Sequence, residues 1–352
     1  MPYGIGPTAT SSAAGRARSA APKRLELSLA IAMNPRTQAV LDGTVAPEGI
    51  DLVPSAIFPS EVFWRQLKYA EFDVSEMSLS ALMRLTAGGD DRWVGLPIFP
   101  TRHFFHTWIL IRRASGIKTP GDLKGRRVGV PEYQQTAALW ARGFLQHEFA
   151  VRPSDMEFWM ERDTAHSHAG ALGFNPPPGV TINQIPPDKN IGTMMVSGEL
   201  DATLLYIREN TLIDRSTIDL WTHSDIQPLF PDPVAEGIRY YQSSGIFPIN
   251  HAMVMRRQIA EKHPWAVLNL LNAFNEANAI ADQIRMTHME YHLATGALPP
   301  AARAIVEHPV VRHGVVANRT VLETAARYSF EQGLTPSVLP LDSIFATNTH
   351  DV

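Results

Sequence analysis

Two of the thirteen histidines are candidate proton-transfer groups. Imidazole suits this role because its ordinary pKa lies near neutral pH, where it can give or take a proton. His251 follows Phe247 and Pro248, whose apolar side chains indicate a shaped, partly dry pocket. We therefore favour His251 as a general acid, with His106 as the second candidate.

Carboxylates and hydroxyls are present that could support such a transfer. Glu76 and Glu132 could act as bases, because burial would raise the pKa of either carboxyl toward neutral pH. Ser78 and Ser80 follow Glu76 closely and could donate hydrogen bonds to substrate oxygens. Their hydroxyls could equally cap the local chain.

Three arginines could hold a carboxylate, namely Arg36, Arg102 and Arg208. A guanidinium presents a planar fork of N–H groups that matches two carboxylate oxygens. Arg102 is the strongest candidate because it follows Pro100 at the end of an apolar strand, where α/β folds place ligands.

A second candidate anion site is the turn from Pro131 to Thr136, which joins a predicted strand to a predicted helix. Free backbone N–H groups at a helix start favour negative charge. The same turn could also be an ordinary helix start that binds nothing.

The chain contains no cysteine, so a metal would need His, Asp or Glu ligands. On an extended segment His166 and His168 would point to one side, an arrangement that suits a divalent metal. Because no third ligand is assured, the sequence favours a loop that covers a substrate or faces solvent. We expect no cofactor, with a divalent metal at this loop as the alternative.

The composition excludes several classes of protein. Lys and Arg number 31 against 35 Asp and Glu, so the chain lacks the basic surplus that binds nucleic acid. No stretch of about 18 apolar residues is present, so we expect no membrane span. Residues 1–23 are basic but lack the apolar run of an export signal, which predicts a disordered tail and a cytoplasmic protein. The sequence leaves a homo-oligomer open.

Alternating strands and helices predict an α/β fold of about two domains. Period-two alternation of apolar and polar residues predicts a strand from Leu25, and a helix over Pro59–Tyr69 should follow, capped by Ser60. The other elements expected in the first unit are a strand over Val74–Met77, a helix over Ser78–Leu85, and strands over Trp93–Phe99 and Trp108–Arg112.

A second unit is expected to begin near Gly116. Its predicted elements are a strand over Arg127–Val130, a helix over Gln134–Phe149, a long loop over 163–187, a helix over Ile191–Ser197 and a strand over Asp201–Tyr206. The chain then continues through a strand over Ile246–Met255 and a helix from Pro264 with Val267, Leu270, Leu271, Phe274 and Ala281 on one face. We expect three parts: a tail at 1–23, one lobe from 24–115 and 245–352, and a second lobe from 116–244.

Several motifs resemble those of known proteins. Leu123–Val130 followed by Ser197–Ala202 resembles the type II periplasmic solute-binding fold. Longer segments, in the same order, resemble the 4,5-dihydroxyphthalate decarboxylase family: Val45–Leu52, Phe72–Ser80, Gly129–Gln134 and Gly245–His251. The resemblance runs from about Leu25 to Phe345. It implies two α/β lobes, each a mixed sheet flanked by helices, with a ligand cleft between them.

The resemblance also implies an activity, that of a carboxy-lyase in aromatic acid catabolism. Such an enzyme removes carbon dioxide from a dihydroxylated aromatic dicarboxylate, such as 4,5-dihydroxyphthalate, and yields a dihydroxybenzoate (protocatechuate). Without a cofactor, the ipso carbon must be protonated while a para hydroxyl is ionised or strongly hydrogen-bonded. The site then needs groups that hold the second carboxylate, an acceptor for the phenol and a general acid above the ring carbon. The resemblance places these further residues in the substrate site: Tyr133, Gln134, Thr136, Phe247 and Asn250.

Two other functions are alternatives to a decarboxylase. A solute-binding protein for an aromatic carboxylate would use the same arginines and helix start without any reaction. Pyrimidine-precursor chemistry, found in a related branch of the fold, is weakened because the chain has no cysteine and no histidine-rich motif of that type.

Overall fold

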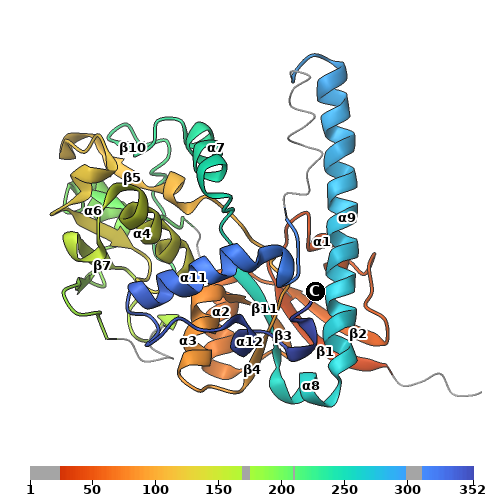
Figure 1. Ribbon diagram of the computed structural model, residues 1–352. Helices are drawn as coiled ribbons and strands as arrows, with labels where there is room; N and C mark the ends of the chain where they lie inside the picture. Colours follow the sequence, from red (N-terminus) through yellow and green to blue (C-terminus); the bar gives the residue numbers. More distant parts are fainter. Residues whose placement is uncertain (1–23, 169–174, 209–210, 299–310) are drawn as a thin grey trace, which may run out of the picture.

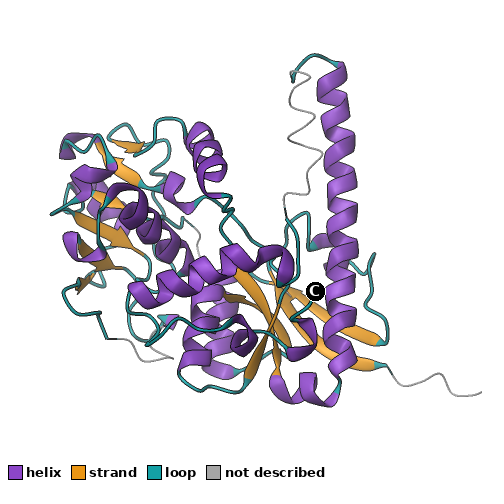
Figure 2. Ribbon diagram, viewed as in Figure 1, coloured by secondary structure: helices purple, strands orange, loops and turns teal. Residues whose placement is uncertain are grey.

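A computed structural model shows two α/β lobes, each built on its own mixed sheet (Figure 1). Helices flank both sheets (Figure 2), which confirms the fold class that the sequence predicts. The structure describes residues 24–168, 175–208, 211–298 and 311–352. The tail expected at 1–23 lies outside the described residues.

The first lobe contains a five-stranded sheet in the order β2-β1-β3-β11-β4. Its strands are β1 (Leu25–Ile31), β2 (Ile50–Ala56), β3 (Val74–Ser78), β4 (Trp93–Leu96) and β11 (His251–Arg256). β1 is parallel to β2 and β3, whereas β11 runs antiparallel to both β3 and β4. This late strand sets His251 opposite Ser78 and Met253 opposite Glu76.

The helices around the first sheet come from both ends of the chain. They are α1 (Gln38–Leu41), α2 (Pro59–Tyr69), α3 (Leu79–Ala87), α8 (Arg257–Lys262), α9 (Pro264–Ala294), α11 (Arg319–Glu331) and α12 (Leu341–Ile344). The first half of α9 buries Val267, Leu270 and Phe274, as the sequence predicts, and its far half projects away from the sheet (Figure 1). Within the described parts of the chain, no helix combines the length and apolar character needed to cross a membrane.

The start of α2 differs in one detail from the prediction. Phe58 takes the N-cap position and Pro59 opens the helix, where its missing N–H is tolerated. Ser60 does not cap the helix, because its hydroxyl donates a hydrogen bond to Asp214 of the other lobe at 2.8 Å. The expected cap is therefore wrong, and the hydroxyl serves a contact between the lobes.

The second lobe contains a six-stranded sheet in the order β10-β5-β9-β6-β7-β8. Its strands are β5 (Leu110–Arg112), β6 (Arg127–Val130), β7 (Glu157–Met160), β8 (Thr181–Gln184), β9 (Ala202–Thr203) and β10 (Ile226–Pro228). Its helices are α4 (Thr136–Phe149), α6 (Ile191–Ser197) and α7 (Pro233–Ser244). Because β5 pairs with β9 and β10, the first crossover between the sheets lies between Leu96 and Leu110, not at Gly116.

Several element boundaries differ from those predicted. β5 begins at Leu110 because Phe105–Trp108 forms a 3-10 turn, and β11 begins at His251 where Ile246 was expected. The loop expected over 163–187 contains β8. The remaining 3-10 turns are Arg113–Ser115, Pro120–Leu123, Pro153–Asp155, Val316–Asn318 and Thr347–Thr349.

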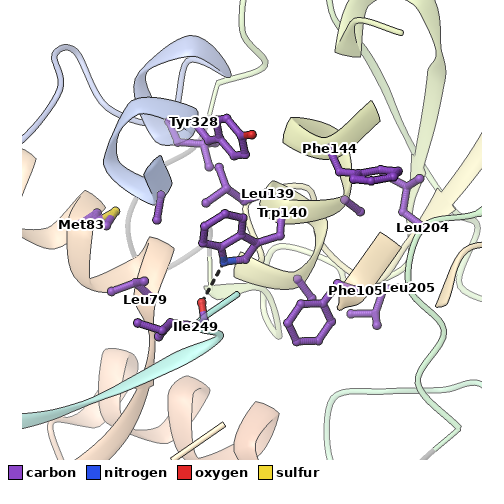
Figure 3. Packing of buried hydrophobic residues seen from close by; sticks show 14 of the residues in the cluster. Leu79, Met83, Phe105, Leu139, Trp140, Phe144, Leu204, Leu205, Ile249 and Tyr328 are labelled. Carbon is purple, nitrogen blue, oxygen red and sulfur yellow. Dashed lines mark hydrogen bonds between the residues drawn. The ribbon is translucent and has the colours of Figure 1, made fainter. Parts of the chain in front are cut away.

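One hydrophobic cluster extends across both lobes (Figure 3). Its members include Leu79 and Met83 of α3, Leu139, Trp140 and Phe144 of α4, and Tyr328 of α11. Trp140 Nε1 also donates a hydrogen bond to Ile249 O at 2.8 Å, which joins α4 to the chain just before β11. The lobes therefore share a packed core and do not meet only at connecting segments.

Gly143 allows α4 to approach α11 closely. A Cβ atom built on Gly143 would lie 2.1 Å from the Tyr328 ring, far inside van der Waals contact. The Tyr328 ring in turn packs edge-on against Trp140, with ring centroids 5.6 Å apart. The absence of a side chain at Gly143 is therefore what lets Tyr328 reach this position.

We expect Gly143→Ala to destabilise the protein by about 1–3 kcal/mol, the usual cost of overpacking a core. Denaturant unfolding followed by circular dichroism measures the change. Gly121→Ala is the matched control, since a Cβ there would have Thr119 Oγ1 as its nearest neighbour at 3.7 Å. Equal losses in both variants would show that the contact with Tyr328 does not constrain position 143.

Candidate functional site

Glu76, in the middle of β3, and His251, the first residue of the adjacent strand β11, form a buried pair. Glu76 Oε1 lies 2.6 Å from His251 Nδ1, and Asn250 Nδ2 lies 2.7 Å from His251 Nε2. Because a carboxylate accepts hydrogen bonds, Nδ1–H donates to Glu76 and Nε2 accepts from the Asn250 amide. The carboxylate thus orients the ring and leaves Nε2 as the atom that can exchange a proton with a ligand.

Two further donors hold Glu76 in place. Its Oε2 accepts from the backbone N–H of Ala32 at 2.9 Å, and its Oε1 accepts from the Thr101 hydroxyl at 3.1 Å. Ala32 directly follows β1 and Thr101 comes after β4, so the segments that follow these two strands both donate to this carboxylate.

Arg36 and Arg102 place two guanidinium groups near one another in the same lobe. Burial, together with the nearby charge of Arg36, lowers the pKa of Arg102 to about 10. The groups that accept their hydrogen bonds are neutral: Pro100 O for Arg36, and Phe247 O, Arg312 O and Asn318 Oδ1 for Arg102. Over the described ranges, neither guanidinium has a carboxylate within ion-pair distance, and the Nε of each is buried without a hydrogen-bond partner. Two cations without an ion-pair partner in the described residues are suited to hold an anion.

The segment from Pro100 to Arg102 connects this arginine pair to Glu76. Arg36 Nη2 donates to Pro100 O at 2.6 Å, and the next residue, Thr101, donates to Glu76. Burial lowers the pKa of Arg36, whereas the charges of Asp282 and Glu76 oppose that shift. Arg36 and the Glu76–His251 pair are therefore joined through two neighbouring residues, which the sequence alone did not establish.

Four further predicted residues meet at the contact between the lobes. Ser78 Oγ lies 2.8 Å from Thr136 Oγ1, and that oxygen also accepts from Ser80 N at 2.9 Å. Ser80 Oγ donates to Gln134 O at 2.5 Å. The turn before α4 is thus bound to the start of α3, so these groups hold the two lobes against each other.

A second buried network lies in the other lobe and includes Glu132. Arg162 Nη1 donates to Glu132 Oε2 at 3.1 Å, and its Nε and Nη2 donate to Asp214 Oδ1 at 2.9 and 2.8 Å. Burial alone would lower the pKa of Arg162, but the charges of Asp214 and Glu132 raise it above its usual value. Glu132 Oε1 also accepts from Ser167 Oγ at 2.5 Å and from Gln134 Nε2. Glu132 is therefore an acceptor already occupied by several donors.

The helix α2 lies between the two networks. The Phe63 ring packs edge-on against His251, with centroids 4.7 Å apart, and against His168, with centroids 5.6 Å apart. Ser60 lies one turn before Phe63, and its hydroxyl donates to Asp214. The Ser60 carbonyl oxygen lies 3.2 Å from His168 Nε2. One face of α2 therefore contacts His251 of the first lobe and His168 of the second.

Sequence reasoning missed Phe63, Arg162 and Asp214. Arg162 and Asp214 are 52 positions apart, and no local pattern marks charges that pair over such a distance inside the protein. Phe63 had a signal, because it follows Ser60 by three residues on a predicted helix and so shares its face.

His106 is placed in an aromatic cluster of the second lobe. Its ring stacks on Phe144 with centroids 3.7 Å apart and meets Tyr240 edge-on at 5.0 Å. Burial lowers the pKa of His106 to about 3, with smaller contributions from the charges of Arg239 and His103. A histidine with this pKa is neutral at pH 7, so it is poorly suited to donate a proton.

Other candidates lie apart from the Glu76–His251 pair. Arg208 is exposed and forms an ion pair with Asp219. The Phe247 ring packs against Phe104 with centroids 4.9 Å apart, although its carbonyl oxygen binds Arg102. Tyr133 is fully buried, and burial raises its pKa.

His166 and His168 do not share a ligand position. Residues 164–166 form a turn, so the segment is not extended as expected. His166 Nδ1 lies 2.8 Å from Asp163 Oδ1, whereas the buried His168 lies 3.3 Å from Glu132 Oε2. Among the residues that the structure describes, no group of three His, Asp or Glu side chains is arranged to hold a metal.

Comparison with known proteins identifies the family. No protein-family model matches the chain. A 4,5-dihydroxyphthalate decarboxylase from Comamonas testosteroni is 34% identical over 258 residues, which cover 73% of this chain and 76% of that protein. The chain belongs to the 4,5-dihydroxyphthalate decarboxylase family. A member from Pseudomonas putida is 35% identical over 181 residues, which cover 51% of this chain and 70% of that protein.

Solved structures confirm the fold of this family member. The periplasmic aliphatic sulphonate-binding protein SsuA from Escherichia coli superposes with a TM-score of 0.53 at 16% identity, covering 93% of this chain and 92% of that protein. The desulfurization enzyme DSZB gives a TM-score of 0.50 at 16% identity over 92% of this chain and 96% of that protein. A binding protein and an enzyme thus have the same fold, so the fold alone does not decide the chemistry.

We expect Arg162→Met to destabilise the protein by about 3–5 kcal/mol, because Glu132 and Asp214 would remain buried without their cation. Denaturant unfolding measures the loss. Arg327→Gln is the control, because its ion pair with Glu331 is exposed and such pairs contribute about 1 kcal/mol or less. A loss of that small size in Arg162→Met would mean that the two carboxylates are not held by this arginine.

Proposed function

We propose that this protein removes carbon dioxide from a dihydroxylated aromatic dicarboxylate such as 4,5-dihydroxyphthalate and releases a dihydroxybenzoate. The observation that carries the proposal is the buried Glu76–His251 pair beside two arginines that have no carboxylate partner in the described structure. Membership of the decarboxylase family supports the same reaction.

Arg36 and Arg102 are assigned to the carboxylate that stays on the ring. Their present acceptors are mainly backbone carbonyls, which an anionic ligand can supplement or replace. Charge-assisted bonds from a guanidinium fork are directional, so they would fix the ring relative to His251.

His251 is assigned as the general acid. In the reacting state Nε2 carries a proton and no longer accepts from the Asn250 amide, and Glu76 stabilises the resulting imidazolium through Nδ1. The proton passes from Nε2 to the ipso carbon, and the bond to the leaving carboxylate then breaks. The electrons of that bond restore the aromatic ring as carbon dioxide departs, so the atoms and electrons balance without a redox cofactor.

Gln134 is assigned as the acceptor for the para hydroxyl. Its Oε1 is buried without a hydrogen-bond partner, while its Nε2 donates to Glu132. A hydrogen bond from the hydroxyl to this oxygen would help to stabilise the dienone-like intermediate. Glu132 fits this role less well, because Arg162 and Ser167 already donate to its oxygens. Ser78, Ser80 and Thr136 are assigned to closing the lobes over the ligand.

A non-catalytic binding protein for an aromatic carboxylate is the second candidate, favoured by the likeness to the sulphonate-binding protein. It would need the arginine pair but not an oriented general acid. A cytoplasmic location, a homo-oligomer and independence from metal remain predictions.

Purified protein mixed with 4,5-dihydroxyphthalate should release carbon dioxide and one equivalent of dihydroxybenzoate, at the same rate with and without a chelator. Gas release and chromatography of the product measure both. Loss of activity in chelator would make the reaction metal-dependent. Binding measured by calorimetry without release would favour the second candidate.

His251→Asn should lower kcat at least about a hundredfold with little change in KM, because the amide cannot act as an acid. Glu76→Gln should lower kcat and change its pH profile, since the neutral amide cannot stabilise the imidazolium. His288→Asn, on the exposed part of α9, is the matched control and should retain activity. Full activity in His251→Asn would remove this histidine from the mechanism.

A further inference from the structure

Arg142 and Arg162 of the second lobe are both fully buried, but the groups that surround their guanidinium groups differ. Arg162 is ion-paired with Glu132 and Asp214. Arg142, in α4, has no carboxylate within ion-pair distance in the described part of the chain. A buried cation needs compensation, because it has lost its hydration.

The contacts of Arg142 use only part of its guanidinium. Nε donates to Gln332 Oε1 at 2.8 Å, and the guanidinium carbon lies 3.8 Å from the centre of the Tyr133 ring. Nη1 and Nη2 are buried and have no hydrogen-bond partner. These two nitrogens form the fork that binds planar oxyanions in other proteins.

Burial lowers the pKa of Arg142 to about 10, so the group is still charged at neutral pH. The Tyr133 face compensates part of that charge through a cation–π contact. It supplies no acceptor for Nη1 or Nη2, however, so the hydrogen-bonding capacity of the fork remains unused.

Two further donors are unpartnered on the turn that carries Gln332. Ser329 Oγ and Thr335 Oγ1 are buried without hydrogen-bond partners. The backbone N–H groups of Leu334 and Thr335 both donate to Ser329 O, at 2.8 and 3.3 Å, which folds the end of α11 into a compact turn. Gln332 Nε2 donates to Leu139 O at 3.0 Å and so fixes this turn against α4.

We propose that Arg142 binds a small planar oxyanion of the carboxylate class, comparable in size to formate or bicarbonate, where α4 meets the end of α11. The unused fork selects a planar anion with two oxygens, and the complete burial of Arg142 restricts its size. The arginine pair assigned to substrate lies in the other lobe, so this anion would not bind to the guanidinium groups assigned to the proposed reaction. Because the core shared by the lobes also passes through α4 and α11, a bound anion would stabilise the folded protein as a whole.

Thermal unfolding in sodium formate and in sodium chloride, at equal ionic strength and neutral pH, tests the proposal. The wild-type midpoint should rise by about 2 °C or more in formate relative to chloride, because an anion that binds only the folded state stabilises it. Arg142→Met should abolish that difference. Arg142→Lys keeps the charge without the fork and should need at least about tenfold more formate for the same shift.

Two controls make the outcome specific. Arg327→Gln, an exposed arginine of α11, should keep the wild-type response. Arg102→Gln should also keep it; if the response is lost there and kept in Arg142→Met, formate binds the substrate site and the inference is wrong. Should Arg142→Met fail to fold, the line width of ¹³C-formate with wild-type protein and with Arg142→Lys measures the same binding. Equal wild-type midpoints in the two salts, or no broadening of the formate signal, would overturn the proposal.

Discussion

The insertion of β11 between β3 and β4 is the constraint on which the candidate site depends. His251 is 175 positions after Glu76, and the antiparallel pairing of β11 with β3 brings the two side chains to 2.6 Å. The same pairing sets the two crossovers beside each other, because Asn250 N donates to Thr101 O at 2.9 Å and Arg102 bridges to Ile249. Both the Glu76–His251 contact and the position of Arg102 therefore follow from where one short strand enters the sheet.

The buried arginines fall into two groups that differ in the groups that accept their hydrogen bonds. Arg162 is neutralised by carboxylates of its own chain, so its bonds are structural. Arg36 and Arg102 bond to neutral oxygens instead, and Arg142 leaves two nitrogens without an acceptor. Because removing a charge from water is costly, a guanidinium without a counter-charge marks a place where an external anion gains most. The partners of an arginine are therefore more informative about binding than its burial alone.

The sequence predicts local structure well where one pattern dominates. The helix Pro59–Tyr69 and the strand Arg127–Val130 have the expected bounds, since proline placement and a short apolar run define them. Strand ends near the crossovers were misplaced, because residues such as Ile249 form a bridge and bond between segments without extending a strand.

The sequence predicted individual residues of the candidate site but not which of them contact one another. Glu76 and His251 were both expected, yet only the sheet topology shows that they touch. The sequence pattern did not predict that Arg142 is buried, because a charged residue in an amphipathic helix normally faces solvent. The aromatic surroundings of His106 likewise come from segments as distant as α7, which no local motif reveals.

The late position of β11 also bears on how the chain is made. The strands β1 to β4 leave the ribosome first, but the strand that pairs with both β3 and β4 follows only after the whole second sheet has been synthesised. The second sheet spans Leu110 to Pro228 and pairs entirely within itself, so it can form while the first sheet still lacks β11. Until then β3 and β4 present unpaired edges that can associate with other chains. The nascent protein therefore passes through a stage in which its first sheet is incomplete, and the arrival of the segment that begins with His251 ends both that exposure and the separation of Glu76 from His251.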